Sequence, residues 1–117
     1  MNNFSLSSKS DQDIAVMLPK GYINDIGAER LERTSVQFLG NGLKKIVVNF
    51  TDVQFINTIG ISIFTGMVQK TLEHDSTLCF TNMKKVHRDM FEMVGLIKHV
   101  KVFKDEKDAL SFLTERG

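Results

Sequence analysis

Apolar residues follow two different periods along this chain. Short runs rich in apolar and β-branched residues lie at 14–18, 45–50, 77–81 and 100–103, and the longer segments between them repeat apolar residues every three or four positions. Short apolar runs are typical of buried strands, and the longer spacing is typical of helices that bury one face. Their alternation predicts an α/β fold with a mostly parallel sheet.

The first two apolar runs are an exception to this alternation. Residues 4–8 and 14–18 flank the segment from Ser10 to Asp13, which is rich in turn-forming residues. Strands joined by a short turn pair antiparallel, so we expect the chain to open with a hairpin and the sheet to be mixed. The predicted order of elements is β-β-α-β-α-β-α-β-α, with about four α-helices.

The second predicted helix runs from Gly60 to about His74. Its apolar residues at helical spacing form a stripe that we expect to be buried, namely Ile61, Phe64, Val68 and Leu72. Other apolar residues of this helix lie off the stripe and are candidates for an exposed partner surface, namely Ile59, Ile63 and Met67.

The third predicted helix also carries an apolar stripe, with Gly95 as a stop signal within it. We expect its buried residues to be Val86, Met90, Met93, Val94 and Ile97. Asp105 is a natural N-cap for a last helix. That helix is expected to bury Ala109, Leu110 and Leu113.

The composition is that of one globular domain over residues 1–117, with 42% hydrophobic and 25% charged residues. Lys and Arg total 15 against 14 for Asp and Glu, which argues against direct binding of nucleic acid. No apolar run approaches the roughly 20 residues of a membrane helix. The N-terminal segment also lacks the pattern of a signal peptide. We therefore expect no membrane insertion and a cytoplasmic location.

Candidate metal ligands and nucleophile motifs are badly spaced. His74, His87 and His99 show neither helical ligand spacing nor a cysteine pair beside them, so no metal site is expected. Gly60 begins a segment similar to a Gly-x-Ser-x-Gly nucleophile elbow, but Phe64 occupies the position of the second glycine. A hydrolase is therefore not supported.

Cys79 is the only cysteine and lies in an apolar run. It has no partner for an internal disulfide, which suits a reducing compartment, and we expect a buried structural thiol. An enzyme with Cys79 or Ser62 as nucleophile is an alternative, but the sequence places no activating base beside either residue. We therefore expect no enzyme and no cofactor, and a protein that works by binding.

Asn57 and Thr58 are two polar residues inside the apolar run from Phe55 to Phe64. At the start of a helix, one of their side-chain oxygens can accept a hydrogen bond from a free N–H of the first turn. A phosphate on Thr58 would face the same N–H groups and the positive end of the helix dipole. From the residues alone, both a cap and a phosphorylation switch remain open.

The segment from Ile46 to Gly60 resembles the central motif of the STAS family, whose bacterial members include the anti-sigma factor antagonists. The family pattern is a strand, an Asp, a loop, and then Asp-Ser-(Ser/Thr)-Gly at the start of a helix. The segment from Gly21 to Asn24 is similar to the family's Gly-Glu-Leu-Asp segment. The likeness extends from about residue 11 to 114 and implies a single STAS-like domain.

The resemblance implies an anti-sigma factor antagonist that binds an anti-sigma factor with Ser/Thr kinase activity in a partner-switching pathway. Thr58 corresponds to the family's phosphorylatable serine, and a PP2C-type phosphatase is a further implied partner. The implied partner surface consists of Asn24, Asn57, Thr58, Ile59, Gly60, Ser62 and Ile63. The alternative is a STAS subunit that docks onto a transporter or sensor complex without phosphorylation.

Some residues of this chain depart from the family pattern. Asn24, Asn49 and Asn57 stand where the family commonly has Asp. An amide keeps its hydrogen-bonding capacity but removes a negative charge, so a phosphate on Thr58 would meet less repulsion than in those relatives. Ile59 also puts an apolar group in place of a second hydroxyl.

Overall fold

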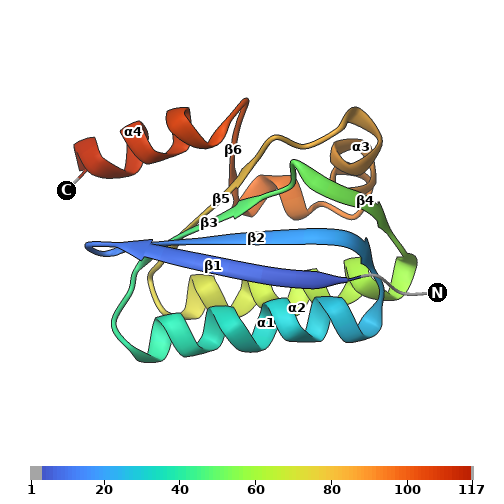
Figure 1. The fold of residues 1–117 in the computed structure, drawn as a ribbon, viewed down its shortest axis with the longest axis horizontal. Helices are drawn as coiled ribbons and strands as arrows, with labels where there is room; N and C mark the ends of the chain where they lie inside the picture. The colour runs from blue at the N-terminus through green and yellow to red at the C-terminus, as the bar shows by residue number, and fades with distance from the viewer. Residues whose placement is uncertain (1–3, 117) are drawn as a thin grey trace.

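A computed structural model describes residues 4–116 of the chain (Figure 1). The ends of the predicted domain, 1–3 and 117, lie outside the described residues. The strands are β1 (Ser5–Asp11), β2 (Ile14–Ile23), β3 (Lys45–Asn49), β4 (Asp52–Ile56), β5 (Thr77–Thr81) and β6 (Lys101–Phe103). The helices are α1 (Asp25–Gly40), α2 (Thr58–Glu73), α3 (Lys85–Met93), a short 3-10 helix (Leu96–His99) and α4 (Glu106–Arg116).

The sheet has the strand order β1-β2-β3-β5-β6. Among the strands described between residues 4 and 116, only β1 and β2 pair antiparallel, so the predicted mixed, mostly parallel sheet and the α/β fold class are confirmed. β2 is long enough to pair twice along one edge: residues 14–17 pair with β3, and residues 20–23 pair with β4. The second half of β2 therefore runs beside β4 toward the starts of α1 and α2.

The predicted order of elements was wrong in omitting β4. Its sequence does not alternate regularly, because Val53 and Ile56 are buried whereas Gln54 and Phe55 between them are exposed. The pairing of β2 with β4 shifts register between Gly21 and Tyr22, which accounts for the broken alternation. A strand with such an irregularity lacks the alternation of apolar and polar residues from which strands are predicted.

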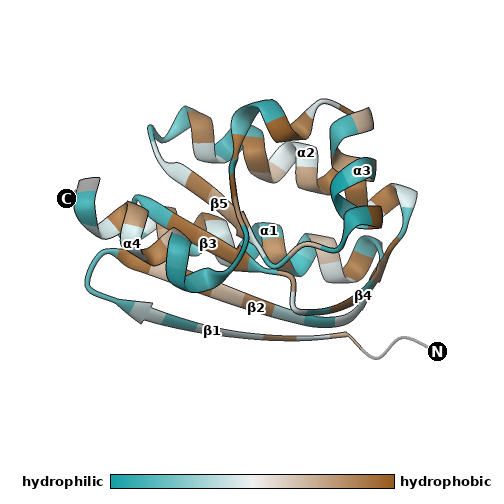
Figure 2. Ribbon diagram, turned by 90° about the horizontal axis from the view of Figure 1, so that it is seen from above, coloured by the Kyte–Doolittle hydropathy of each residue, from teal (hydrophilic) through white to brown (hydrophobic). Residues whose placement is uncertain are grey.

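Helices cover both faces of the sheet unequally (Figure 1). α1 and α2 lie side by side on one face, and α4 lies on the opposite face near the β1–β2 turn. β3 and β5 in the centre of the sheet are mainly hydrophobic, whereas β1 at the edge is mainly hydrophilic (Figure 2). This pattern agrees with central strands that are covered on both faces.

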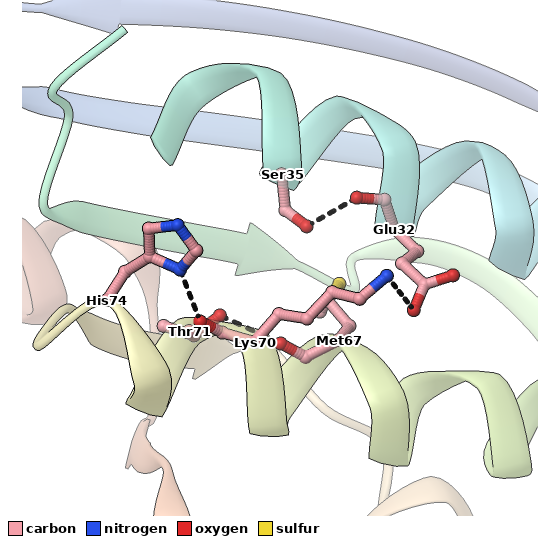
Figure 3. Close-up of polar contacts among 6 residues, drawn as sticks. All are labelled: Glu32, Ser35, Met67, Lys70, Thr71 and His74. Carbon is pink, nitrogen blue, oxygen red and sulfur yellow. Dashed lines mark hydrogen bonds and ion pairs between the residues drawn. The ribbon is translucent and has the colours of Figure 1, made fainter. Parts of the chain in front are cut away.

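Two small hydroxyl side chains are buried where α1 and α2 face each other (Figure 3). Ser35 and Thr71 are fully buried, and each hydroxyl donates a hydrogen bond to a carbonyl of its own helix, to Glu32 at 2.7 Å and to Met67 at 2.9 Å. Lys70 and Glu32 form an ion pair across the two helices at 3.3 Å. The buried hydroxyls are thus satisfied locally, which avoids the free-energy cost of burying an unpaired polar group.

The centre of the core on the α1–α2 side is a cluster of four phenylalanine rings, contributed by four different segments. Phe50, Phe64, Phe80 and Phe91 have ring centroids 5.1 to 6.0 Å apart, and all four side chains are almost fully buried. Most of the pairs meet edge to face, which is the favoured arrangement of aromatic rings. This cluster fastens α3, through Phe91, to α2 and the sheet.

The buried faces of two helices differ from the predictions. In α2, Met67 is buried and Leu72 is exposed, the reverse of what the spacing indicated. In α3, the buried residues are His87 and Phe91, and α3 ends at Met93 rather than continuing toward Ile97. The residues wrongly expected in the core are Val86, Met93 and Val94, which are exposed. Gly95 does end the helical segment, in the left-handed conformation at φ 79°.

His87 gives the fold a dependence on pH. Burial lowers the pKa of its imidazole, and the nearby Lys84 charge lowers it further, against a hydrogen bond with the backbone of Gln54 that raises it. The unfolded chain therefore binds this proton more readily than the folded chain, and stability is lost as pH falls below the ordinary value of 6.5.

We expect the free energy of unfolding of the wild type to decrease between pH 7 and pH 5, and His87→Gln to reduce this decrease. Urea titrations at several pH values measure the free energy of unfolding of each protein. An unchanged slope in His87→Gln would show that other groups account for the dependence.

Candidate functional site

The starts of α1 and α2 lie next to each other because of the pairing between β2 and β4. Ile23 pairs with Ile56 at the ends of these strands, and an asparagine follows each of them. The Asn57 N–H donates to the Ile23 carbonyl at 3.1 Å, which extends the pairing by one residue. Asn24 and Asn57 are therefore brought together at the carboxyl edge of the sheet.

Both asparagines are N-caps. The Asn24 side-chain oxygen accepts a hydrogen bond from the Gly27 N–H at 3.0 Å, and the Asn57 side-chain oxygen accepts one from the Gly60 N–H at 2.7 Å. Each side chain satisfies one of the free N–H groups of its helix. The capping role predicted for Asn57 is thus present, and Asn24 repeats it on α1.

The two helix starts also share a sequence. Residues 22–28 read Tyr-Ile-Asn-Asp-Ile-Gly-Ala, and residues 55–61 read Phe-Ile-Asn-Thr-Ile-Gly-Ile. Each segment has an aromatic residue at the strand end, the capping asparagine, and an isoleucine and a glycine in the first turn. Asp25 takes on α1 the position that Thr58 takes on α2. A local repeat of this kind explains why the two caps have the same geometry.

Exposed apolar side chains accompany the two caps. Ile26 and Ile59 are 64% and 58% exposed, and Phe55 is 50% exposed. The rings of Tyr22 and Phe55 meet edge to face with centroids 5.0 Å apart. We call this region the twin-cap surface, which consists of Tyr22, Asn24, Asp25, Ile26, Phe55, Asn57, Thr58 and Ile59. Exposed apolar residues grouped in this way mark interaction sites more often than single ones do.

The remaining site residues predicted from the sequence surround the start of α2. Thr58 and Ser62 are exposed, and the Ser62 hydroxyl donates to the Thr58 carbonyl at 3.4 Å. Ile63 is half-buried and packs against the core. Gly60 is buried, so it shapes the helix start and offers little surface to a partner.

Sequence reasoning missed part of this surface. Tyr22, Ile26 and Phe55 were not among the predicted site residues, although they are exposed beside the caps. The repeat between residues 22–28 and 55–61 was the available signal, because matched segments at paired strand ends bring their exposed residues together.

Asn49 lies apart from the twin-cap surface and has a structural role. Its side-chain oxygen accepts hydrogen bonds from the Thr51 N–H and hydroxyl at 2.9 and 2.6 Å, and its amide donates to Glu106 at 2.9 Å. Burial alone would raise the pKa of Glu106, but the hydrogen bonds from Asn49 and Lys9 outweigh it and lower this pKa. Asn49 thereby fastens the turn between β3 and β4 to α4.

Two kinds of catalytic group can be judged in residues 4–116, namely metal ligands and the Cys79 thiol. No cluster of three His, Cys, Asp or Glu side chains within this range could hold a metal ion. Burial raises the pKa of the Cys79 thiol to about 12, in spite of the Lys101 charge that lowers it, so the thiolate needed for nucleophilic attack is not formed near neutral pH. The burial predicted for Cys79 is confirmed.

The geometry of this fold has known counterparts. The sequence profile of the STAS domain matches residues 5–109. Because this match covers most of the chain, the chain belongs to the STAS domain family. A search among curated proteins finds no match.

Solved structures with the same fold include antagonists and a transporter protein. An anti-sigma factor antagonist from Mycobacterium paratuberculosis is 17% identical with a TM-score of 0.81, over 96% of this chain and 95% of that one. The Bacillus cell fate determinant SpoIIAA in its phosphorylated form is 17% identical with a TM-score of 0.72, over 94% and 98% of the two chains. A sulfate transporter family protein from Wolinella succinogenes is 13% identical with a TM-score of 0.79, over 92% and 89%.

These identities are low, so the three relatives show the fold and not the partner. Among the helices described between residues 4 and 116, none has the length and apolar character needed to cross a bilayer.

The two caps provide a direct test of the helix starts. Asn57→Ala and Asn24→Ala are each expected to lower the free energy of unfolding by about 1 kcal/mol, because an N–H of the first turn loses its acceptor. Asn57→Asp is the matched control, since a carboxylate can accept the same hydrogen bond and suits the helix dipole. Urea unfolding measures all three. A loss in Asn57→Asp as large as in Asn57→Ala would contradict the capping role.

Proposed function

We propose that this protein is an anti-sigma factor antagonist that binds a kinase-type anti-sigma factor through the twin-cap surface. The observation that carries the proposal is the position of Thr58: it is exposed, it is the first residue of α2, and the exposed apolar residues Phe55 and Ile59 lie close to it along the chain. A partner that packs on Ile59 and Phe55 must come close to the Thr58 hydroxyl. The antagonist would act in the cytoplasm, without cofactor or metal of its own.

Phosphorylation of Thr58 is the regulation that we propose. A phosphate adds about −1.5 to −2 charges in the middle of an apolar contact. Removing that charge from water against Ile59 and Phe55 of this chain and the apolar groups of a partner is strongly unfavourable. The free N–H groups at the start of α2 would stabilise the phosphate within the antagonist itself. A PP2C-type phosphatase would restore the binding form.

A phosphorylation switch requires a large change in the affinity for the partner. Turning an almost fully bound partner into an almost fully released one takes about a 10⁴-fold change in affinity, or roughly 5.5 kcal/mol. Asn24 and Asn57 carry no charge, so repulsion from these neighbours does not contribute to release. The exposed Asp25 is the acidic residue of the twin-cap surface that remains to do so.

A kinase-type anti-sigma factor from the same organism provides the test. Incubation with that kinase and ATP should add one phosphate at Thr58, detected by mass spectrometry, and Thr58→Val should abolish it. Thr58→Glu should weaken binding to the kinase at least about tenfold in calorimetry. Thr114→Glu, at an exposed threonine of α4, is the control and should leave binding unchanged. No modification at Thr58, together with full binding of Thr58→Glu, would overturn the phosphorylation switch.

A second candidate is a STAS subunit that docks onto a transporter or sensor complex without phosphorylation. The uncharged caps and the apolar Ile59 favour it, because a permanent contact needs no source of repulsion. In that case Ile59→Glu should abolish docking, whereas Thr58→Val should leave docking and its regulation unaffected.

A further inference from the structure

α3 presents a second apolar stripe to solvent. Its buried face consists of His87 and Phe91, yet Val86 is 59% exposed and Met93 is 87% exposed. Met90 lies half-buried between them. Val94, directly after the helix, is 54% exposed and extends the same side. Single exposed apolar residues are ordinary, but residues that follow helical spacing form the continuous seam typical of helix pairing.

The charges of α3 are arranged against the helix dipole. The basic residues Lys85 and Arg88 lie in its first half, and the acidic residues Asp89 and Glu92 lie in its second half. A helix by itself favours the opposite distribution. The ion pairs Lys85–Asp89 at 2.8 Å and Arg88–Glu92 at 3.5 Å also run in the less favourable direction, with the cation nearer the N-terminus.

We propose that α3 pairs antiparallel with α3 of a second copy of this chain. In an antiparallel pair the basic half of each helix lies beside the acidic half of the other, so charges that are badly placed within one copy become complementary between two. A twofold axis at the level of residue 88 brings Lys85 near Asp89 of the second copy, and the reverse contact forms at the same time. In this register Val86 lies opposite Met90 of the second copy, and Met93 lies at each end of the apolar seam.

The seam is small, and its size determines the strength of the dimer. A contact between two nine-residue helices buries less than the roughly 1,200 Å² at which standard interfaces begin. The dimer is therefore weak and reversible. α3 is separate from the twin-cap surface in sequence and rests on β4 through the Lys84 amine, which donates to the Val53 carbonyl. The pairing does not depend on the proposed function.

Sedimentation velocity on the purified chain, in a concentration series up to about 1 mM, tests the pairing. The weight-average sedimentation coefficient of the wild type should rise with concentration. Met93→Lys should remove this rise, because it puts a positive charge at the end of the seam that lies beside the basic half of the partner helix. Leu72→Lys, at an exposed leucine of α2, is the matched control and should behave as the wild type. A rise that Met93→Lys leaves intact and Leu72→Lys removes would place the contact elsewhere and overturn the proposal.

Reversing the charges at Lys85 and Asp89 gives a second test, in which renewed association of the mixed variants cannot result from misfolding. Lys85→Glu and Asp89→Lys should each remove the rise when studied alone, since like charges then face each other across the axis. Mixed in equal amounts, the two variants should associate again, because each supplies the charge that the other needs. The double variant should also associate. A mixture that remains monomeric throughout the series, or a wild type that does, would overturn the proposal.

Discussion

Phe91→Ala is expected to lower the free energy of unfolding by about 3–5 kcal/mol. The Phe91 ring is fully buried and meets Phe50, Phe64 and Phe80 with centroids 5.2 to 6.0 Å apart. Its removal takes away apolar burial and leaves a cavity between segments that cannot all move inward. Chemical denaturation followed by circular dichroism gives the value.

Met93→Ala, two residues further along, is the control for Phe91→Ala. Because Met93 is 87% exposed, its loss should change the free energy of unfolding by no more than about 0.5 kcal/mol. The pair of variants therefore reports which side of α3 faces the core. A large loss in Met93→Ala with a small one in Phe91→Ala would mean that α3 is rotated relative to the described orientation.

Gly60→Val is expected to destabilise the protein by about 2–3 kcal/mol, in the upper part of the range for overpacking. A Cβ atom at Gly60 would lie 3.1 Å from the Ile23 carbonyl oxygen and 3.2 Å from the capping oxygen of Asn57. The Ile23 carbonyl already accepts the Asn57 N–H and cannot move away without loss of that bond. Calorimetric unfolding measures the change in stability.

Gly40→Val tests the same substitution where space is available. No atom outside the immediate chain lies within 4 Å of a Cβ atom at Gly40, which ends α1. We expect a change within about 0.5 kcal/mol. Equal losses in the two valine variants would show that general helix propensity, rather than the close contact at the start of α2, determines the effect.

The order of most elements was predictable because it depends on local signals. The hairpin, the central strands and the last helix each have a turn or a cap in the sequence, and Asp105 does accept the Asp108 N–H at 2.9 Å. β4 was missed because its irregular pairing with β2 removes the alternation of apolar and polar residues that predicts a strand. Local patterns report local structure, and this irregularity arises from contact with a distant strand.

The buried face of α3 could not be predicted from the spacing of its apolar residues. Val86, Met90 and Met93 repeat as regularly as His87 and Phe91 do. The first set contains more apolar residues, but the second contains the ring that fits the space between Phe64 and Phe80. Shape decided the outcome, and a hydrophobic pattern carries no information about shape.

In the candidate site, too, local features could be predicted from the sequence and features that depend on distant contacts could not. The helix start at Asn57 and Thr58 was readable from local chemistry, and the structure bears out the cap. The partner role of the predicted residues stays a prediction. The contribution of Tyr22 and Phe55 required the pairing of β2 with β4, which joins residues 33 positions apart in sequence and cannot be seen from either segment alone.

The double pairing of β2 has a further consequence. One strand carries Asn24 at its end and also holds Asn57 through the Ile23 carbonyl, so both helix starts are fixed to the same support. A backbone that is already fixed in this way loses little further conformational entropy when a second molecule covers it. Association at this end of the protein should therefore be fast and close to rigid-body docking, with loop rearrangement contributing little to its rate.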